Sequence, residues 1–350
     1  MAAAIAAVCA LHPIPIRSAC LPREVMQSFH KLLTTSYLAL AAAATTMRGP
    51  VRPPCPFLPS MHRLFRTVVL TLAWAAGTLA AQPLLTPAQV QALTPDTAVR
   101  LIDVREASAY AMQHVPGALS APYPRWRATG ANLGLPPTLA ELTQLVQELG
   151  LNPDTRAVLI YTGIDATDFG GAARAYWTLK HAGHDAVSIL DGGTRGWIAA
   201  GRETEAGSVE PKPAAPYPVA FRDGWRSDAA ASRVALEAGA IFLDGRSASY
   251  FAGTEKAGEA KRAGHIPGAV HADYARLYDP ARFGLRSREE LIALLAAVPP
   301  GPIVSYCNTG HTAALNWFVL REIFGRGDVT LYDGSMTEWT QDDANPVATG

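Results

Sequence analysis

Short apolar, β-branched segments alternate between residues 84 and 350 with segments of helical periodicity. In 139–149 and 288–297, apolar residues recur every three to four positions, which is the spacing of one helix face. This alternation favours an α/β fold in which helices cover both faces of a parallel sheet. The segments that we expect to form strands are 99–103, 157–161, 187–190, 240–244, 303–306 and 329–332.

This pattern occurs twice at a nearly constant offset, so the chain contains an internal duplication. Each copy carries Asp-x-Arg at the end of its first strand, then His-[Val/Ile]-Pro-Gly-Ala, and later Asp-Gly-[Gly/Ser] followed by a tryptophan. We therefore expect two domains, domain one at 84–205 and domain two at 226–350, joined by a Pro- and Ala-rich linker at 206–225. Trp197, Trp317 and Trp339 are expected in the core.

The segment 61–81 has the features of a secretory signal peptide. A basic start precedes an uncharged apolar run at 68–79 and then small residues, and the run is too short to predict a membrane span. We expect a periplasmic or secreted protein; the alternative is a buried N-terminal helix. Residues 1–60 are expected to be an untranslated or disordered extension, with a transit peptide as the alternative.

Charge and cysteine content narrow the classes of function. Thirty basic and 30 acidic residues cancel, which gives no electrostatic basis for binding nucleic acid or an anionic membrane. No cysteine or histidine cluster has the spacing of a metal site, and we expect no metal, no cofactor and a monomer. Cys307 is the only cysteine after residue 61, which indicates a free reactive thiol or an intermolecular bridge.

Cys307 lies between the expected strand 303–306 and a helical segment at 314–320. A cysteine at a helix N-terminus meets free backbone N–H groups and the helix dipole, which favour a thiolate. The N–H groups of 308–312 can cradle an anionic sulfur, as a backbone nest does for other anions. The pattern therefore predicts a nucleophile.

The loop after Cys307 supplies further candidates. Gly310 allows a tight curl, and the hydroxyls of Thr309 and Thr312 can donate hydrogen bonds to sulfur or substrate. His311 can either assist the thiol and an anionic donor or face solvent. A cysteine phosphatase needs an arginine at the position of Ala313 and is excluded.

The ordered, duplicated motifs with a Cys-x-x-Gly-x-Thr loop only in the second copy resemble the tandem-domain rhodanese family of sulfurtransferases. The resemblance covers about residue 84 to the C-terminus. It implies two rhodanese-like domains, a catalytically silent domain one and an active site at the domain interface. It also implies that Cys307 carries sulfur as a persulfide, which is covalent catalysis of the ping-pong type.

Within this resemblance, Thr162 stands at the position of the cysteine in domain one, in a longer loop that carries Asp165 and Asp168. Domain one is thus interpreted as a scaffold and a wall of the substrate cleft. Arg246 is implied to bind the anionic donor, because a guanidinium suits thiosulfate or a carboxylate. The alternative for Arg246 is a structural ion pair, the role that we expect for Arg105 in domain one.

Two further residues are implied only by mercaptopyruvate-type relatives. There, His114 and Asp103 of domain one would join Thr309 near the thiol, although relatives have serine at that position. Otherwise His114 and His265 are interpreted as structural, with each imidazole bonded to local backbone.

The neutral residues Asn308 and Thr309 do not select the donor, and export favours thiosulfate over a metabolic 2-oxo acid. We expect a thiosulfate sulfurtransferase that passes sulfane sulfur to a thiophilic acceptor such as cyanide or a thiol. The alternatives are a 3-mercaptopyruvate sulfurtransferase and a non-enzymatic persulfide carrier or binding module. The expected substrate-binding set is Arg246, Asn308, Thr309, Gly310, His311 and Thr312.

Overall fold

The structure is a computed structural model that describes residues 82–128, 134–215, 217 and 219–350. The described residues belong to one compact unit. The expected extension at 1–60 and the expected signal peptide at 61–81 lie outside the described residues. Within the described ranges, no helix has the length and apolar character needed to cross a bilayer.

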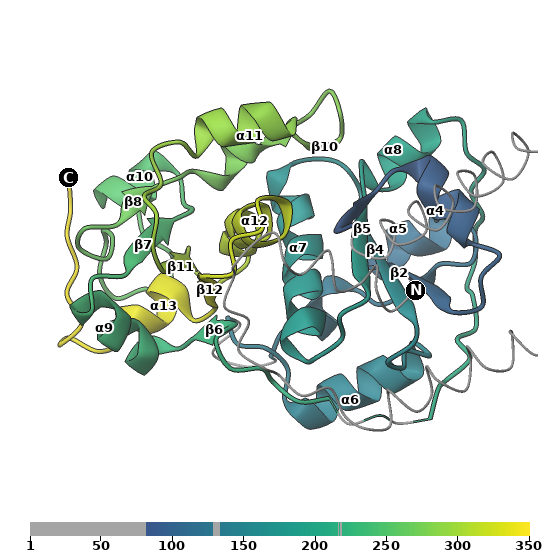
Figure 1. The fold of residues 1–350 in the computed structure, drawn as a ribbon, viewed down its shortest axis with the longest axis horizontal. Coiled ribbons are helices and arrows are strands. Elements are labelled where there is room, and N and C mark those ends of the chain that lie inside the picture. The colour runs from purple at the N-terminus through teal and green to yellow at the C-terminus, as the bar shows by residue number, and fades with distance from the viewer. Residues whose placement is uncertain (1–81, 129–133, 216, 218) are drawn as a thin grey trace, which may run out of the picture. The chain divides into compact units, whose positions relative to one another are not determined.

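Domain one contains a five-stranded parallel sheet in the order β1-β5-β4-β2-β3 (Figure 1). Its strands are β1 (Leu84–Leu85), β2 (Val99–Asp103), β3 (Leu119–Ser120), β4 (Arg156–Ile160) and β5 (Val187–Leu190). Its helices are α4 (Pro87–Leu93), α5 (Ala107–Met112), the 3₁₀ helix η1 (Tyr123–Trp126), α6 (Leu139–Glu148), α7 (Ala166–His181) and α8 (Gly193–Ala199).

Helices cover both faces of this sheet, as the sequence predicts. Successive side chains of a strand point to opposite faces. On β4, Val158 and Ile160 join the apolar cluster that includes α4, α5 and α8, whereas Ala157 and Leu159 join the cluster that includes α6 and α7.

Domain two repeats the arrangement with the sheet order β6-β12-β11-β7-β8, again all parallel. Its strands are β6 (Arg226–Ser227), β7 (Ile241–Asp244), β8 (Val270–His271), β11 (Ile303–Tyr306) and β12 (Val329–Tyr332), with a separate antiparallel pair β9 (Tyr278–Asp279) and β10 (Gly284–Leu285). Its helices are α9 (Ala229–Glu237), α10 (Ala248–Ala252), the 3₁₀ helix η2 (Tyr274–Leu277), α11 (Arg288–Leu294), α12 (Ala313–Phe318), the π-helical η3 (Val319–Ile323) and α13 (Ser335–Trp339).

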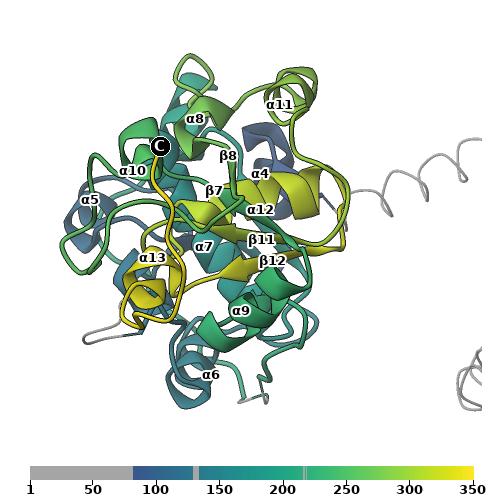
Figure 2. The same cartoon turned by 90° about the vertical axis from the view of Figure 1, so that its left-hand side faces the viewer.

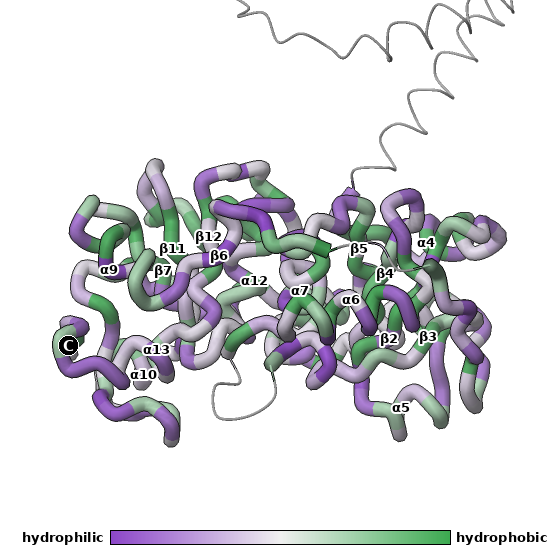
Figure 3. The backbone as a smooth tube through the Cα atoms, turned by 90° about the horizontal axis from the view of Figure 1, so that it is seen from below, coloured by the Kyte–Doolittle hydropathy of each residue, from purple (hydrophilic) through white to green (hydrophobic). Residues whose placement is uncertain are grey.

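The second sheet is also covered on both faces (Figure 2). Helices α9 and α13 contribute to the cluster on one face, and α11 and α12 contribute to the cluster on the other. Figure 3 shows that hydrophobic residues concentrate on the central strands of both sheets. Trp197, Trp317 and Trp339 are buried, which confirms their predicted core positions.

Capping boxes explain where three of the helices begin. In each, the hydroxyl of the cap residue accepts a hydrogen bond from the backbone N–H three residues later, and the Gln or Glu side chain at that position accepts one from the backbone N–H of the cap residue. Two of these helices, α6 and α11, are the ones that the apolar periodicity predicts at 139–149 and 288–297. The capping pairs are Thr86 with Gln89, Thr138 with Glu141, and Ser287 with Glu290.

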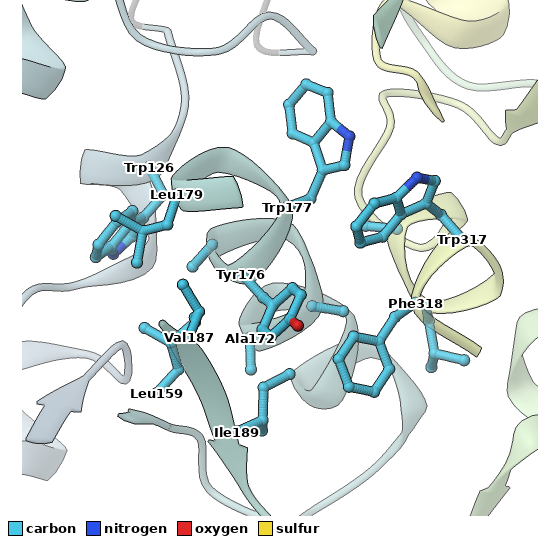
Figure 4. Packing of buried hydrophobic residues seen from close by; sticks show 14 of the residues in the cluster. Trp126, Leu159, Ala172, Tyr176, Trp177, Leu179, Val187, Ile189, Trp317 and Phe318 are labelled. Carbon is cyan, nitrogen blue, oxygen red and sulfur yellow. The ribbon is translucent and has the colours of Figure 1, made fainter. Parts of the chain in front are cut away.

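The two domains share one apolar cluster, at whose centre α7 of domain one packs against α12 of domain two (Figure 4). The ring of Phe318 lies edge-on to those of Phe169 and Tyr176, with centroids 5.7 Å and 5.0 Å away. Because buried aromatic pairs are strongly stabilising, the interface behaves as a core rather than as a loose hinge. It therefore fixes domain one against the carboxyl end of β11, where Cys307 lies.

The linker at 206–225 runs along domain one and bonds to it. The backbone N–H of Val209 donates to the Tyr110 hydroxyl, and that of Ala214 donates to the carbonyl oxygen of Gln147. These contacts hold the linker in place although its sequence has no apolar periodicity.

Candidate active site around Cys307

Cys307 follows the last residue of β11 and is 2% exposed. Its backbone N–H donates to the Ser335 hydroxyl at 3.0 Å, and the N–H of Gly310 donates to the same oxygen at 3.1 Å. That hydroxyl in turn donates to the carbonyl oxygen of Tyr332 at 2.7 Å. One serine at the start of α13 therefore holds both the start and the curl of the loop.

The remaining backbone N–H groups of the loop stay available for a ligand. Among the described residues, the N–H groups of Asn308, Thr309, His311, Thr312 and Ala313 have no hydrogen-bond acceptor. The predicted cradle therefore consists of four of the five expected groups, because Gly310 gives its N–H to Ser335. An anionic sulfur is the kind of ligand that such a backbone concavity binds.

Gly310 is required by the shape of the loop. Its φ is +66°, a conformation that L-residues rarely adopt. A Cβ atom would lie 2.6 Å from the carbonyl oxygen of Asp333 and 2.6 Å from Nη1 of Arg174. Only glycine fits between these groups.

Two arginines of domain one donate hydrogen bonds to backbone carbonyl oxygens of the loop after Cys307. Arg127 donates from Nη2 to the carbonyl oxygen of Thr309 at 2.9 Å. Arg174, which is completely buried in α7, donates from Nη1 to the carbonyl oxygen of Gly310 at 3.2 Å. Domain one, which carries no cysteine among its described residues, therefore contributes directly to the shape of the loop.

His311 connects the loop to α7. Its Nε2 donates to the carbonyl oxygen of Thr167 at 2.8 Å, so this nitrogen carries the proton. Gly170 makes the approach possible, because a Cβ there would lie 3.1 Å from the imidazole Cδ2. Burial lowers the pKa of His311 to about 4, so the ring is neutral at pH 7 and supplies no positive charge to the thiol. Of the two roles considered for His311, a cationic role at pH 7 is not supported, and the partly exposed ring is held against α7 rather than left free in solvent.

Arg246 is engaged by an acid of its own domain. Its Nε and Nη2 form a bidentate pair with Asp244, with a shortest distance of 2.6 Å, and Nη2 also donates to the carbonyl oxygen of Gly264. Nη1 lies 3.5 Å from Oδ1 of Asn308. One edge of the guanidinium is thus structural, and Nη1 is the part left to face a donor. Arg246 and Arg174 both interact electrostatically with Cys307.

Arg105 forms the same pair in domain one, as expected. It bonds bidentately to Asp103 and donates from Nη2 to the carbonyl oxygen of Gln113. Since both copies retain this pair, the Asp-x-Arg motif is first a structural element of the fold. Only in domain two does it lie beside a cysteine loop.

The structure does not bring His114 and Asp103 to the thiol. His114 is buried, with Nδ1 bonded to the carbonyl oxygen of Tyr110 and Nε2 3.2 Å from the Glu205 carboxylate. Asp103 is neutralised by Arg105. The described contacts engage both residues within domain one and give no support to the suggested role beside the thiol. His265 likewise bonds to the carbonyl oxygen of Phe251, which confirms the structural interpretation.

Sheet register corrects the assignment of the silent position. Asp103 pairs with Ile160 across β2 and β4, and Asp244 pairs with Tyr306 across β7 and β11. The residue after Tyr306 is Cys307, so the counterpart of the thiol is Tyr161 rather than Thr162. The sequence alignment is wrong by one residue because it superposes two tyrosines that are not equivalent.

The loop of domain one is also not longer, as expected from the sequence, but shorter. Helix α7 begins at Ala166, and its cap residue Asp165 bonds to two N–H groups of the first turn. Asp168 lies in that turn, and its carboxylate accepts hydrogen bonds from the N–H groups of Thr162, Gly163 and Ile164 at 2.7–3.2 Å. The chain's own carboxylate thus occupies the anion-binding loop of domain one, and the equivalent loop of domain two has no such occupant among the described residues.

A cavity of about 510 Å³ adjoins His311 on the domain-one side. It lies between the Asp168 turn and η1, and its lining includes Tyr123, Thr167, Gly171 and His311. The hydroxyls of Thr309 and Thr312 form no hydrogen bond within the described ranges. Those ranges also contain no group of three His, Cys, Asp or Glu side chains that could hold a metal ion.

Sequence reasoning missed five residues that shape this site: Tyr123, Arg127, Thr167, Arg174 and Ser335. A signal existed only for Ser335, which replaces Gly193 at the matching position of the repeat. Gly193 must be glycine, because a Cβ there would lie 2.5 Å from the carbonyl oxygen of Tyr161. The other four come from domain one and have no local pattern that connects them to Cys307.

Comparison with known proteins agrees with this geometry. Residues 86–200 and 228–342 each match the rhodanese-like domain family. The chain belongs to the rhodanese family. Both matched segments lie within the expected domains, and the tandem rhodanese architecture predicted from the duplicated motifs is confirmed.

Relatives of the two rhodanese domains extend along most of the chain. A sulfur carrier protein of Thermus thermophilus is 32% identical over 75% of this chain and 94% of its own length. A thiosulfate sulfurtransferase of Pseudomonas aeruginosa is 32% identical over 71% of this chain and 90% of its own length. The crystal structure of a 3-mercaptopyruvate sulfotransferase of Escherichia coli has a TM-score of 0.63 at 26% identity, covering 73% of this chain and 98% of that one. Sulfur transfer is therefore the class of activity that the rhodanese domains support.

Proposed function

We propose that this protein is a thiosulfate sulfurtransferase whose sulfur carrier is Cys307. The observation that carries the proposal is the loop itself. A free thiol directly follows a central strand, and the next residues of the loop carry backbone N–H groups without acceptors among the described residues. Such an environment stabilises both a thiolate and a persulfide anion.

The first half-reaction loads the cysteine. The Cys307 thiolate attacks the outer sulfur of thiosulfate, a new S–S bond forms, and the S–S bond of the donor breaks. Sulfite leaves with the electron pair of the broken bond, and the enzyme holds the transferred sulfur as a persulfide anion. The free N–H groups of the loop support the negative charge at each stage.

The second half-reaction removes the transferred sulfur from Cys307. Cyanide attacks the outer persulfide sulfur through carbon, a C–S bond forms, and the S–S bond to Cys307 breaks. Thiocyanate leaves and the thiolate is regenerated, so charge and atoms balance without a further reactant. A thiol acceptor would take the sulfur in the same way, and the two steps together are ping-pong catalysis.

Two other functions have specific support. The likeness to a 3-mercaptopyruvate sulfotransferase favours that donor. The similarity to a sulfur carrier protein favours delivery of the persulfide to a protein partner. Thiosulfate is preferred here because the segment 61–81 has the features of an export signal. Periplasmic or secreted localisation is part of the same proposal.

A comparison of donors tests the proposal. Initial rates are measured with thiosulfate and with 3-mercaptopyruvate, with cyanide as acceptor. We expect a higher kcat/KM with thiosulfate. A higher value with 3-mercaptopyruvate would overturn the choice of donor, and one stoichiometric load without turnover for either would favour the carrier function.

A further inference from the structure

The domain-one side of Cys307 has positive charge that the neighbouring acids do not balance. Nε of Arg226 donates to both carboxylate oxygens of Asp333 at 2.9 Å, and Nη2 of Arg174 approaches the same carboxylate at 3.7 Å. Arg127 forms no ion pair with any described residue, and its guanidinium donates to the carbonyl oxygen of Thr309. Arg174 and Arg226 therefore share the Asp333 carboxylate, and Arg127 has no acidic partner among the described residues, whereas Arg246 is paired with Asp244.

Polar atoms in this region are also unpartnered. Nε of Arg174 is buried and has no hydrogen-bond partner within the described ranges. The hydroxyl of Tyr123 and Nε of Arg127 are also buried and reach no partner at hydrogen-bond geometry, although their side chains contact each other, with the guanidinium 5.7 Å from the ring centroid. Buried polar groups in native proteins are nearly always bonded, so three such atoms in one place indicate a ligand. All three are donors to an anion, since burial raises the pKa of Tyr123 and keeps its hydroxyl protonated at neutral pH.

Tyr123 is the one of these three side chains that lines the cavity beside His311. That cavity has a volume of about 510 Å³, and the Tyr123 ring lies edge-on to that of His311 at 4.8 Å. Tyr123 and Arg174 both interact electrostatically with Cys307.

We propose that Tyr123, Arg127 and Arg174 of domain one form a subsite for the oxyanion end of the sulfur donor. The inference rests on the proposed function and extends it, because it assigns donor recognition to the domain without a cysteine. The chemistry would suit the sulfonate group of thiosulfate or the carboxylate of a 2-oxo thiol. The outer sulfur of the donor would then be directed towards Cys307, with domain one holding the leaving group.

The test uses Tyr123→Phe, which removes one hydroxyl and keeps the ring, and Arg127→Gln, which removes the unbalanced charge. Arg125→Gln is the matched control, because Arg125 lies two residues away, is paired with Glu148 and is exposed. For each protein, loading of Cys307 by thiosulfate and by 3-mercaptopyruvate is measured separately from discharge of the loaded enzyme by cyanide. Binding of sulfate, an inert dianion, is measured by calorimetry.

We expect kcat/KM for loading to fall about 10- to 150-fold in Arg127→Gln, which is the loss of one charged hydrogen bond, and about 3- to 10-fold in Tyr123→Phe. Sulfate affinity should fall in parallel, while the discharge rate and the melting temperature of Tyr123→Phe stay within twofold and a few degrees of wild type. Arg125→Gln should match wild type throughout. A larger loss with one donor than with the other identifies which oxyanion the subsite serves.

Unchanged loading and sulfate binding in both variants would overturn the inference, and so would an equal loss in loading and discharge, which indicates a merely structural role. Failure of the proposed function has a different signature. If wild type is loaded only by 3-mercaptopyruvate, the donor proposal fails while the variants still decide the subsite. If neither donor loads the wild-type protein, the proposed function fails and sulfate binding alone tests the subsite. Equal sulfate affinity of wild type and both variants then refutes the subsite.

Discussion

At the scale of single residues, Arg246 combines a structural ion pair with a proposed role in binding the donor. Arg246 is bound on one edge by Asp244 and leaves Nη1 beside Asn308. Replacing it by alanine would leave the completely buried Asp244 without its charged partner, which destabilises a protein by about 3–5 kcal/mol. A test of its role in binding therefore has to keep the charge, and Arg105 offers the same ion pair without the cysteine loop.

Arg246→Lys and Arg105→Lys separate binding from scaffolding. Both lose the guanidinium fork, so both should lose similar stability in urea unfolding. Only Arg246→Lys should raise KM for thiosulfate, by about 10- to 150-fold, because it alone loses a charged hydrogen bond to the donor. Equal KM values for the two variants would place Arg246 in the scaffold.

Ser335 and Gly310 also show what could be predicted at this scale. Cys307, the free thiol at the end of a strand, and Gly310 in the curl were predictable, because strand, loop and helix follow one another in the chain. Ser335 was not assigned because its hydroxyl acts on residues 25 and 28 positions away. Tyr161 was missed as the counterpart of Cys307 because only strand register, not residue identity, determines which positions are equivalent.

At the scale of elements, the loop between β11 and α12 is held by its neighbours. Ser335 holds it from α13, Arg174 from α7 and Arg127 from the segment after η1. Helices α6 and α11 were predictable from periodicity and from capping residues within a few positions of each other. The packing of α7 on α12 was not, because each helix is apolar on several sides and the sequence does not say which side meets the other domain.

Gly310→Ala tests how tightly the loop is confined. Gly268 is the control, since it has a similar φ of +76° and an added Cβ would meet nothing within 4 Å, whereas Gly310 has φ +66° and close contacts. Gly268→Ala should cost about 1–2 kcal/mol of unfolding free energy from backbone strain. Gly310→Ala should cost about 2–5 kcal/mol, because overpacking adds to the strain, and should also lower kcat. Equal losses would mean that the loop can expand.

At the scale of the whole described unit, domain one completes the site of domain two. Its own anion loop is filled by Asp168, its counterpart of the thiol is a tyrosine, and its arginines contact the active loop. The duplication and the fold could be read from repeated motifs. The different roles of the two domains could not be predicted, because they arise from contacts between residues more than 100 positions apart.

Buried histidines predict an acid-sensitive fold. Burial lowers the pKa values of His181 and His184 to about 4, and both are at most 3% exposed. Below the unfolded pKa of about 6.5, the unfolded state binds protons that the folded state does not, so stability is lost as pH falls towards 4. The loss is up to about 3 kcal/mol per histidine.

Urea unfolding at pH 7.0 and at pH 5.0 measures this effect. We expect a lower midpoint at pH 5.0, and a smaller difference in His181→Gln, which lacks one of the titrating groups. Identical midpoints for the wild-type protein at the two pH values would show that these rings are accessible to protons in the folded state.

The central claim is that Cys307 holds the transferred sulfur. The most direct measurement is intact-protein and peptide mass spectrometry after incubation with thiosulfate and removal of the excess. The account predicts a mass increase of one sulfur atom on the peptide that contains Cys307, its loss on addition of cyanide with stoichiometric release of thiocyanate, and no increase in a folded Cys307→Ser variant. Thiocyanate production by Cys307→Ser at the wild-type rate would contradict it.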